Sequence, residues 1–72
     1  MIIMITLNKV QQFELFCLEN YKISKGIAGR TALNDFKQYN VFNFLSIGYD
    51  VLHTQGKNYI LAEINDFIER RR

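Results

Sequence analysis

The apolar residues in the first half of the chain recur every three or four positions, which is the spacing of a helix that buries one face. This pattern predicts helices over residues 7–22 and 28–39, with a break between them at Gly26. Thr6 or Asn8 is the expected N-cap of the first helix. The predicted buried stripes contain Val10, Phe13, Phe16, Cys17, Leu18 and Tyr21 in the first helix, and Gly29, Ala32, Leu33 and Phe36 in the second.

An acidic residue interrupts the first of these stripes. Glu14 lies four positions after Val10 and three before Cys17, which places it inside the predicted buried arc. The favoured interpretation puts its carboxylate at the edge of the arc, in contact with water, because unpaired glutamates are almost never fully buried. The alternative is a buried carboxylate that is paired with a donor from elsewhere in the chain.

The third segment, residues 41–49, is apolar on nearly every side. Only Asn43 and Ser46 are polar, and a short helix of this kind normally forms the centre of a core. A chain of 72 residues has difficulty covering every face of such a helix. The preferred interpretation is a central buried helix. The alternative leaves one edge, including Phe42 or Phe44, for a partner.

The pattern changes again beyond this segment, and residues 51–61 allow two structures. A strand-like start and the turn composition of residues 54–58 favour a short β-hairpin. Alternatively, the last helix starts directly after Gly56. In both cases the apolar spacing predicts a helix over residues 60–70. Its predicted buried stripe contains Ile60, Ile64, Phe67 and Ile68.

These elements predict a mainly α fold, a compact four-helix single domain over residues 1–72. The short β-hairpin before the last helix is the open point of this prediction. Residues 1–5 are apolar and rich in β-branched side chains, so they form either a short strand or a loose arm. No proline, internal repeat or low-complexity linker divides the sequence.

The composition limits the chemistry of the chain. Its single cysteine, Cys17, and its single histidine, His53, exclude an intramolecular disulfide and a zinc site of the usual Cys/His type within one chain. We expect no cofactor and no metal site. A free cysteine without an export signal or a membrane-spanning segment predicts a cytoplasmic protein with no membrane attachment.

The charge balance bears on nucleic-acid binding. The net charge is only +2, and three of the nine basic residues are Arg70, Arg71 and Arg72, so attraction to polyanions is weak. The order of helices and hairpin matches a winged helix-turn-helix, which makes a nucleic-acid-binding protein the alternative function. Its recognition helix would be residues 41–49, which contain neither Lys nor Arg. Nucleic acid is therefore not the expected partner.

The stretch from Tyr49 to Gly56 is the one place where the composition suggests more than packing. It contains Asp50 and His53, but the only cysteine that would complete a thiol nucleophile is Cys17 in the first helix. Cys17 lies in a predicted buried stripe, where cysteine behaves as a small hydrophobe. The sequence also has no glycine-rich phosphate-binding loop. We therefore predict that the chain is not an enzyme and has no catalytic residue.

The residues from Phe13 to Ile68 resemble a small bacterial family of domains of unknown function. The resemblance rests on the run Leu-His-Thr-Gln-Gly at residues 52–56, which is followed by Tyr-Ile at residues 59–60. Glu63 stands where the family commonly has Asp before Ile. Members are often encoded near genes for ADP-ribosyltransferase-like toxins. The resemblance thus implies an accessory or antitoxin-like role, by association, and no activity of its own.

These observations favour a small intracellular protein-interaction module whose partner is another protein or a second copy of the chain. Tyrosines that flank a turn suit an interface because they bury a ring and expose a polar tip. In the competing, structural interpretation, His53 binds a backbone carbonyl, Thr54 closes the turn and Gly56 meets a backbone requirement. The predicted partner-binding residues are Phe42, Tyr49, Asp50, His53, Thr54, Gln55 and Tyr59.

Overall fold

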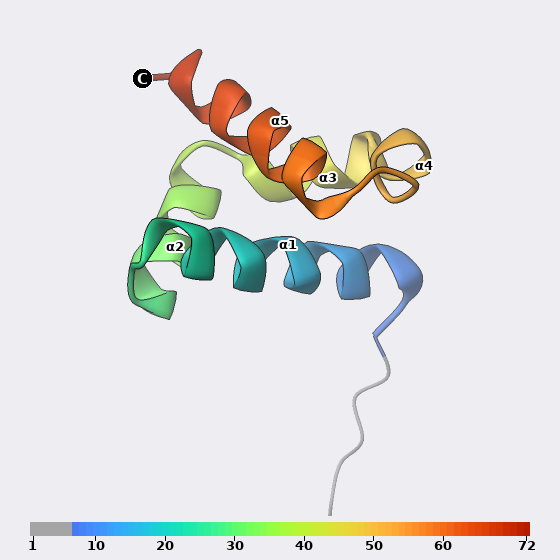
Figure 1. Cartoon of the computed structure of the whole chain (residues 1–72), viewed down its shortest axis with the longest axis horizontal. Helices are drawn as coiled ribbons and strands as arrows, with labels where there is room; N and C mark the ends of the chain where they lie inside the picture. Colours follow the sequence, from blue (N-terminus) through green and yellow to red (C-terminus); the bar gives the residue numbers. More distant parts are fainter. Residues whose placement is uncertain (1–6) are drawn as a thin grey trace, which may run out of the picture.

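The computed structural model describes residues 7–72, which form five helices (Figure 1). The helices are α1 (Lys9–Lys25), α2 (Gly29–Gln38), α3 (Val41–Ile47), α4 (Tyr49–Leu52) and α5 (Lys57–Glu69). α1 forms one side of the molecule, α3 and α5 lie on the other side, and α2 connects the two sides at one end. Residues 7–72 contain no strand, so the mainly α prediction is confirmed, with five helices instead of four. The two alternatives for residues 1–5 lie outside the described residues.

A reciprocal pair of hydrogen bonds fixes the start of α1. The Asn8 side chain accepts a hydrogen bond from the Gln11 amide at 2.8 Å, and the Gln11 side chain accepts one from the Asn8 amide at 3.0 Å. This capping box satisfies two amides that the first turn of a helix leaves unpaired. Gly26 ends α1 with a φ of +64°, in the left-handed region that glycine adopts without strain. Of the two predicted N-caps the structure uses Asn8, and the predicted break at Gly26 is confirmed.

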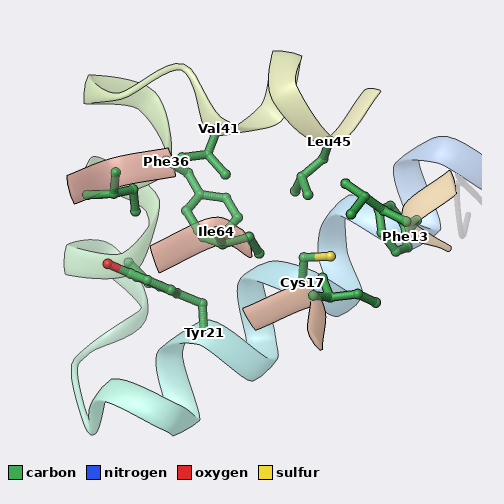
Figure 2. Packing of buried hydrophobic residues seen from close by; sticks show 11 residues of the cluster. Phe13, Cys17, Tyr21, Phe36, Val41, Leu45 and Ile64 are labelled. Carbon is green, nitrogen blue, oxygen red and sulfur yellow. The ribbon is translucent and has the colours of Figure 1, made fainter. Parts of the chain in front are cut away.

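The core brings together side chains from all five helices, and Figure 2 shows part of this packing. Among the polar atoms near it, the Tyr21 hydroxyl donates a hydrogen bond to Asp35 at 2.8 Å. Phe16, which was predicted to widen the α1 stripe, is instead exposed, because it lies on the flank of the stripe away from Leu18, and it is the Leu18 flank that packs against the core. The buried residues are Phe13, Cys17, Tyr21, Ala32, Phe36, Val41, Leu45, Leu52, Ile60, Ile64 and Ile68.

The predicted third helix over residues 41–49 is interrupted at Gly48, where α3 ends and α4 begins. The Gly48 carbonyl accepts hydrogen bonds from the Val51 and Leu52 amides, at 3.1 and 2.8 Å. A Cβ at Gly48 would lie 3.0 Å from Leu52 Cδ1 and 3.3 Å from the Phe44 carbonyl oxygen. Glycine thus allows the chain to turn closely at this point, and the turn directs Leu52 into the core.

The burial of the third segment agrees in part with each of its two interpretations. Val41 and Leu45 are fully buried, as a central helix requires, whereas Phe44 is only half-buried. Ile47 has 78% of its surface exposed, so one edge of the segment is left uncovered. The most exposed residue of this edge is Ile47 and not Phe42, which packs on the ring of Phe36.

The predicted β-hairpin over residues 51–61 is wrong, and the alternative with a helix directly after Gly56 is correct. α4 closes in a turn in which the Gln55 amide donates to the Leu52 carbonyl at 3.0 Å, and α5 begins at Lys57. Helical geometry from Lys57 onward places Ile60 on the same face as Ile64 and Ile68. The burial of this whole isoleucine stripe outweighs the strand preference of the individual residues.

Glu14 takes the position at the edge of the buried arc. It is half-buried and takes part in none of the ion pairs of residues 7–72. Partial burial raises the pKa of its carboxyl group above the usual value, because desolvation penalises the charged form. The favoured interpretation, a carboxylate that reaches water beside the core, agrees with this placement.

Two apolar residues on α3, one buried and one exposed, give a direct test of this fold. Leu45→Ala should lower the free energy of unfolding by about 2–5 kcal/mol, because it removes side-chain atoms from a fully buried site and leaves a cavity. Ile47→Ala should change it by less than about 0.5 kcal/mol, because its side chain is mostly in water. Urea unfolding of both variants measures the difference. Equal losses would contradict the assigned orientation of α3.

Candidate functional site

The stretch from Tyr49 to Gly56 forms α4 and the turn that follows it. The Tyr49 ring meets Phe13 of α1 edge-on, with centroids 5.5 Å apart and an interplanar angle of 78°. On the same ring the His53 imidazole stacks at 4.2 Å and an interplanar angle of 6°. The three rings form a row that anchors α4 to α1, so Tyr49 is half-buried and contributes to packing.

Two polar side chains close the end of α4. His53 Nδ1 lies 2.6 Å from the Tyr49 carbonyl oxygen, and Thr54 Oγ1 donates to the Val51 carbonyl at 2.8 Å. A carbonyl oxygen only accepts, so in the neutral ring Nδ1 carries the hydrogen and Nε2 is left as an acceptor. The Tyr49 carbonyl also accepts the His53 backbone amide at 3.0 Å, so His53 adds a second contact to it, whereas Thr54 satisfies a carbonyl in the last turn of α4. The structural interpretation of His53 and Thr54 therefore agrees with the contacts that they make.

Gly56 does not meet the backbone requirement that was predicted for it. Its φ of −71° is open to any residue, and a Cβ added to it would have no neighbour within 4 Å. It is the N-cap of α5, a position at which glycine is acceptable but offers no side-chain hydrogen bond. The left-handed glycine of the chain is Gly26, and the closely packed one is Gly48.

The other predicted partner-binding residues are dispersed. Phe42 packs against Phe36 of α2 with ring centroids 5.3 Å apart, so it contacts a different element from Tyr49. Asp50 and Gln55 are exposed on α4 and the following turn. Tyr59 is exposed on the first turn of α5, where hydrogen bonding to Glu63 and the charge of that carboxylate raise the pKa of its hydroxyl. Of the predicted set, the structure brings only Tyr49 and His53 into contact through their side chains.

A surface hollow between α3 and α5 was missed by the sequence analysis. It is open to solvent and has a volume of about 230 Å³. The Phe44 and Phe67 rings form its apolar wall, stacked with centroids 4.2 Å apart and an interplanar angle of 26°. The lining residues are Asn40, Asn43, Phe44, Ile47, Gly48, Phe67 and Arg71. Two features of the sequence could have indicated this hollow: Phe67 lies at the edge of the predicted α5 stripe, and the third segment is apolar on nearly every side.

Arg71, which follows the end of α5, lines this hollow. Its guanidinium carbon lies 3.6 Å from the centroid of the Phe67 ring, which is a cation–π contact. Arg71 also lines a second, adjacent hollow of about 340 Å³, whose walls again include Phe44 and Phe67. The two hollows therefore share the aromatic pair and the arginine over it. We call the surface formed by the lining residues of both hollows the α3–α5 face.

A further set of exposed apolar side chains lies on the outer side of α1. Leu15, Phe16 and Ile23 are exposed, and Ile23 has 71% of its surface in contact with solvent. Helical spacing places Leu15 nearly opposite Cys17, and places Phe16 and Ile23 on one flank of the buried stripe. Because α1 is apolar on both sides, its sequence pattern alone did not separate the inner stripe from the outer one.

The chemistry available to the chain is limited by the burial of its thiol. Cys17 has 1% of its surface exposed, and burial, with a smaller contribution from the charge of Glu14, raises its pKa to about 12. A thiol in this state is protonated at neutral pH and is a poor nucleophile. Within residues 7–72, no group of three His, Cys, Asp or Glu side chains lies together so as to hold a metal ion.

No helix in the described part of the chain combines the length and the apolar character that crossing a membrane requires.

Comparison with known proteins gives one family match. Residues 12–71 match the model of a family described as "Protein of unknown function (DUF3791)". No curated protein and no solved structure shows a significant match to the chain. The matched residues include every residue of α2 to α5 and the whole lining of the α3–α5 face.

The raised pKa of Cys17 predicts how stability depends on alkaline pH. The native state holds the thiol proton more tightly than the unfolded chain, in which the thiol pKa is near 9.0. The resulting stabilisation is complete below pH 9 and should be lost as the pH rises towards about 12. Urea unfolding between pH 7 and 11 should therefore show a steeper alkaline decline for the native sequence than for Cys17→Ala. Parallel declines in the two proteins would contradict the assignment.

Proposed function

The chain belongs to the DUF3791 family, and we propose that it is a protein-interaction module that binds its partner through the α3–α5 face. The observation that carries this proposal is the position of Ile47. Its side chain is 78% exposed at the rim of a hollow whose wall is a stacked pair of aromatic rings. Exposed isoleucine beside exposed aromatic surface is typical of a docking site that a partner covers.

The shape of this face suits a protein partner more than a free small molecule. Pockets for small molecules normally enclose most of the ligand, whereas this hollow is partly open to solvent. Aromatic residues and arginine are enriched in protein–protein interfaces, and this face presents two stacked phenylalanines with an arginine over one of them. Asn40 and Asn43 supply polar groups at the edge, as the rim of an interface does.

The exposed residues of α4 extend the proposed contact surface. Gly48 lines the hollow and α4 follows it directly, so Asp50 and Val51 lie close to its edge in the chain. Both are exposed, and Val51 has 64% of its surface in solvent. Because Tyr49, His53 and Thr54 have internal partners, we assign them to holding α4 in place and not to primary contacts with a partner.

The resemblance described above supplies the biological setting of the proposal. The run Leu-His-Thr-Gln-Gly at residues 52–56 lies in α4 and the turn after it, directly beyond the hollow in the chain. Association with ADP-ribosyltransferase-like toxin genes would make the partner a toxin-type protein and the chain its accessory or antitoxin-like protein.

The nucleic-acid alternative has less support from the side chains available. A winged helix-turn-helix needs a hairpin wing, and residues 51–61 contain the end of α4, a turn and the start of α5. α3, which would be its recognition helix, contains no basic residue. We therefore do not advance this function.

A matched pair of isoleucine substitutions tests the proposed face. Ile47→Asp and Ile23→Asp each place a charge on a highly exposed apolar position, so both variants should remain folded. Each protein is tagged, purified from cells of its native host and compared by quantitative mass spectrometry. A protein captured by the native sequence should be lost with Ile47→Asp and retained with Ile23→Asp. Reciprocal capture by the identified protein confirms that the contact is direct.

Two results would overturn the proposal. Loss of the captured protein with Ile23→Asp alone would move the interface to the outer side of α1. Equal capture by all three proteins would mean that neither face binds it. Sedimentation of the three purified proteins covers the remaining case, in which the partner is a second copy of the chain.

A further inference from the structure

The three consecutive arginines after α5 differ in their partners. Arg70 Nε lies 3.0 Å from Asp66 Oδ2, and an Arg72 guanidinium nitrogen lies 3.6 Å from Glu69 Oε1. Arg71 takes part in neither pair, and among residues 7–72 its contact is with the face of the Phe67 ring. Among residues 7–72, Arg71 is therefore the arginine of this group that has no ion pair.

Stacking on Phe67 leaves the binding capacity of Arg71 intact. A guanidinium group stacks through its flat face, while its five N–H donors point outward in the plane of the group. The ring also restricts the side chain, so less conformational freedom is lost when a ligand binds. Arg71 is thus held at the rim of the hollow with donors available for a bidentate contact to a carboxylate.

The charges around the hollow favour an acidic ligand. Arg71 is the one charged residue among the residues that line the 230 Å³ hollow. In the adjacent hollow the positive charges of Arg70 and Arg71 face the negative charges of Glu63 and Asp66. A carboxylate would therefore be attracted on the Arg71 side of the aromatic pair, and a basic group at the same place would be repelled.

We propose that the α3–α5 face binds a segment of another protein in which a large apolar side chain is accompanied by an acidic residue. This inference rests on the proposed function and specifies the chemistry of the partner. The apolar side chain enters the hollow against Phe44 and Phe67, beside Ile47, and the carboxylate pairs with Arg71. An apolar anchor in a groove with a charged contact beside it is a common mode of recognition for a peptide or a helix.

A second copy of the chain fits this face less well. In a two-fold contact the same patch lies on both subunits, and the carboxylates of this patch already have partners within the chain. Asp66 pairs with Arg70, and Glu63 is hydrogen-bonded to the Tyr59 hydroxyl, so the two Arg71 side chains would meet without a free carboxylate between them. A head-to-tail contact would place the outer side of α1, with Leu15, Phe16 and Glu19, on the α3–α5 face of the next copy. Such a contact does not close unless its rotation generates a ring, and it otherwise propagates into open assemblies.

The test uses a displayed library of amphipathic helical peptides as the probe. Its apolar positions and their neighbours are randomised, with acidic, basic and neutral residues equally represented. Peptides selected on the native sequence should be enriched in large apolar residues next to Asp or Glu. For one selected peptide, Arg71→Glu should weaken binding about tenfold or more, because it removes a charge-assisted pair and adds repulsion. Exchange of the peptide's acidic residue for Lys should restore binding to Arg71→Glu.

Arg72→Glu is the matched control, since it makes the same charge change at a residue that lines neither hollow. It should weaken binding by less than about threefold. Selected peptides without an acidic preference, or equal losses for Arg71→Glu and Arg72→Glu, would overturn the role of Arg71. So would a selection that enriches no peptide at all. In each case the interaction module still stands if capture from the host depends on Ile47.

Two other results would show that the α3–α5 face binds something else or nothing. Self-association of the native sequence that is abolished by Ile47→Asp, with no acidic peptide selected, would replace the foreign segment by a second copy. If Ile47→Asp affects neither host capture nor peptide binding, the α3–α5 face is not an interface, and both the proposed function and this inference fail together.

Discussion

The close turn at Gly48 determines which apolar side chains the fold covers and which it exposes. The Gly48 carbonyl accepts hydrogen bonds from the amides of Val51 and Leu52, and a Cβ at Gly48 would come within 3.0 Å of Leu52 Cδ1. Leu52 is thereby directed into the core, while Ile47, one residue before the turn, is left in solvent. Had α3 continued as a straight helix to residue 52, the positions after residue 48 would have a different orientation relative to α5. The hollow beside Gly48 is thus a consequence of the same turn that completes the core.

The size of the domain explains why some apolar surface stays uncovered. Small domains bury a lower fraction of their surface than large ones, and this chain has neither a disulfide nor, within residues 7–72, a cluster of metal-binding side chains to compensate. Its stability depends on fully buried residues such as Phe36, Leu45 and Ile64. Every helix that contributes to such a core has a second side for which no further element is available. Apolar residues remain exposed on that second side in several helices, and the most exposed of them are Ile47, Ile23 and Val51.

The sequence pattern predicted the central residues of the buried stripes in the two longest helices. Phe13, Cys17 and Tyr21 of α1, and Ile60, Ile64 and Ile68 of α5, are buried as predicted, because in these cases the periodicity and the burial have the same cause. Within the described residues, the prediction failed where local composition competed with long-range packing. Residues 51–61 have a composition that suits a hairpin, and only the docking of the isoleucine stripe makes their second half helical.

The candidate site was harder to predict because it depends on contacts between distant residues. Phe44 and Phe67 are 23 positions apart, and nothing in the spacing of either segment indicates that their rings stack. The polar stretch after Tyr49 was predicted to bind a partner because its composition is unusual. Its side chains are largely committed to closing α4, as the hydrogen bonds of His53 and Thr54 show. In this chain the unusual polar residues His53 and Thr54 serve the fold, and ordinary apolar residues such as Ile47 are left exposed.

The position of Arg71 connects the end of α5 to the proposed binding chemistry. An apolar hollow alone binds many partners weakly, because hydrophobic contact is not directional. A fixed charge at its rim adds discrimination, since a partner without the complementary group leaves the arginine desolvated and unpaired. The neighbouring arginines are paired, Arg70 with Asp66 and Arg72 with Glu69. The positive charge at the 230 Å³ hollow therefore comes from Arg71. Specificity on this face would then be set by Arg71, while the area of contact is supplied by Phe44, Ile47 and Phe67.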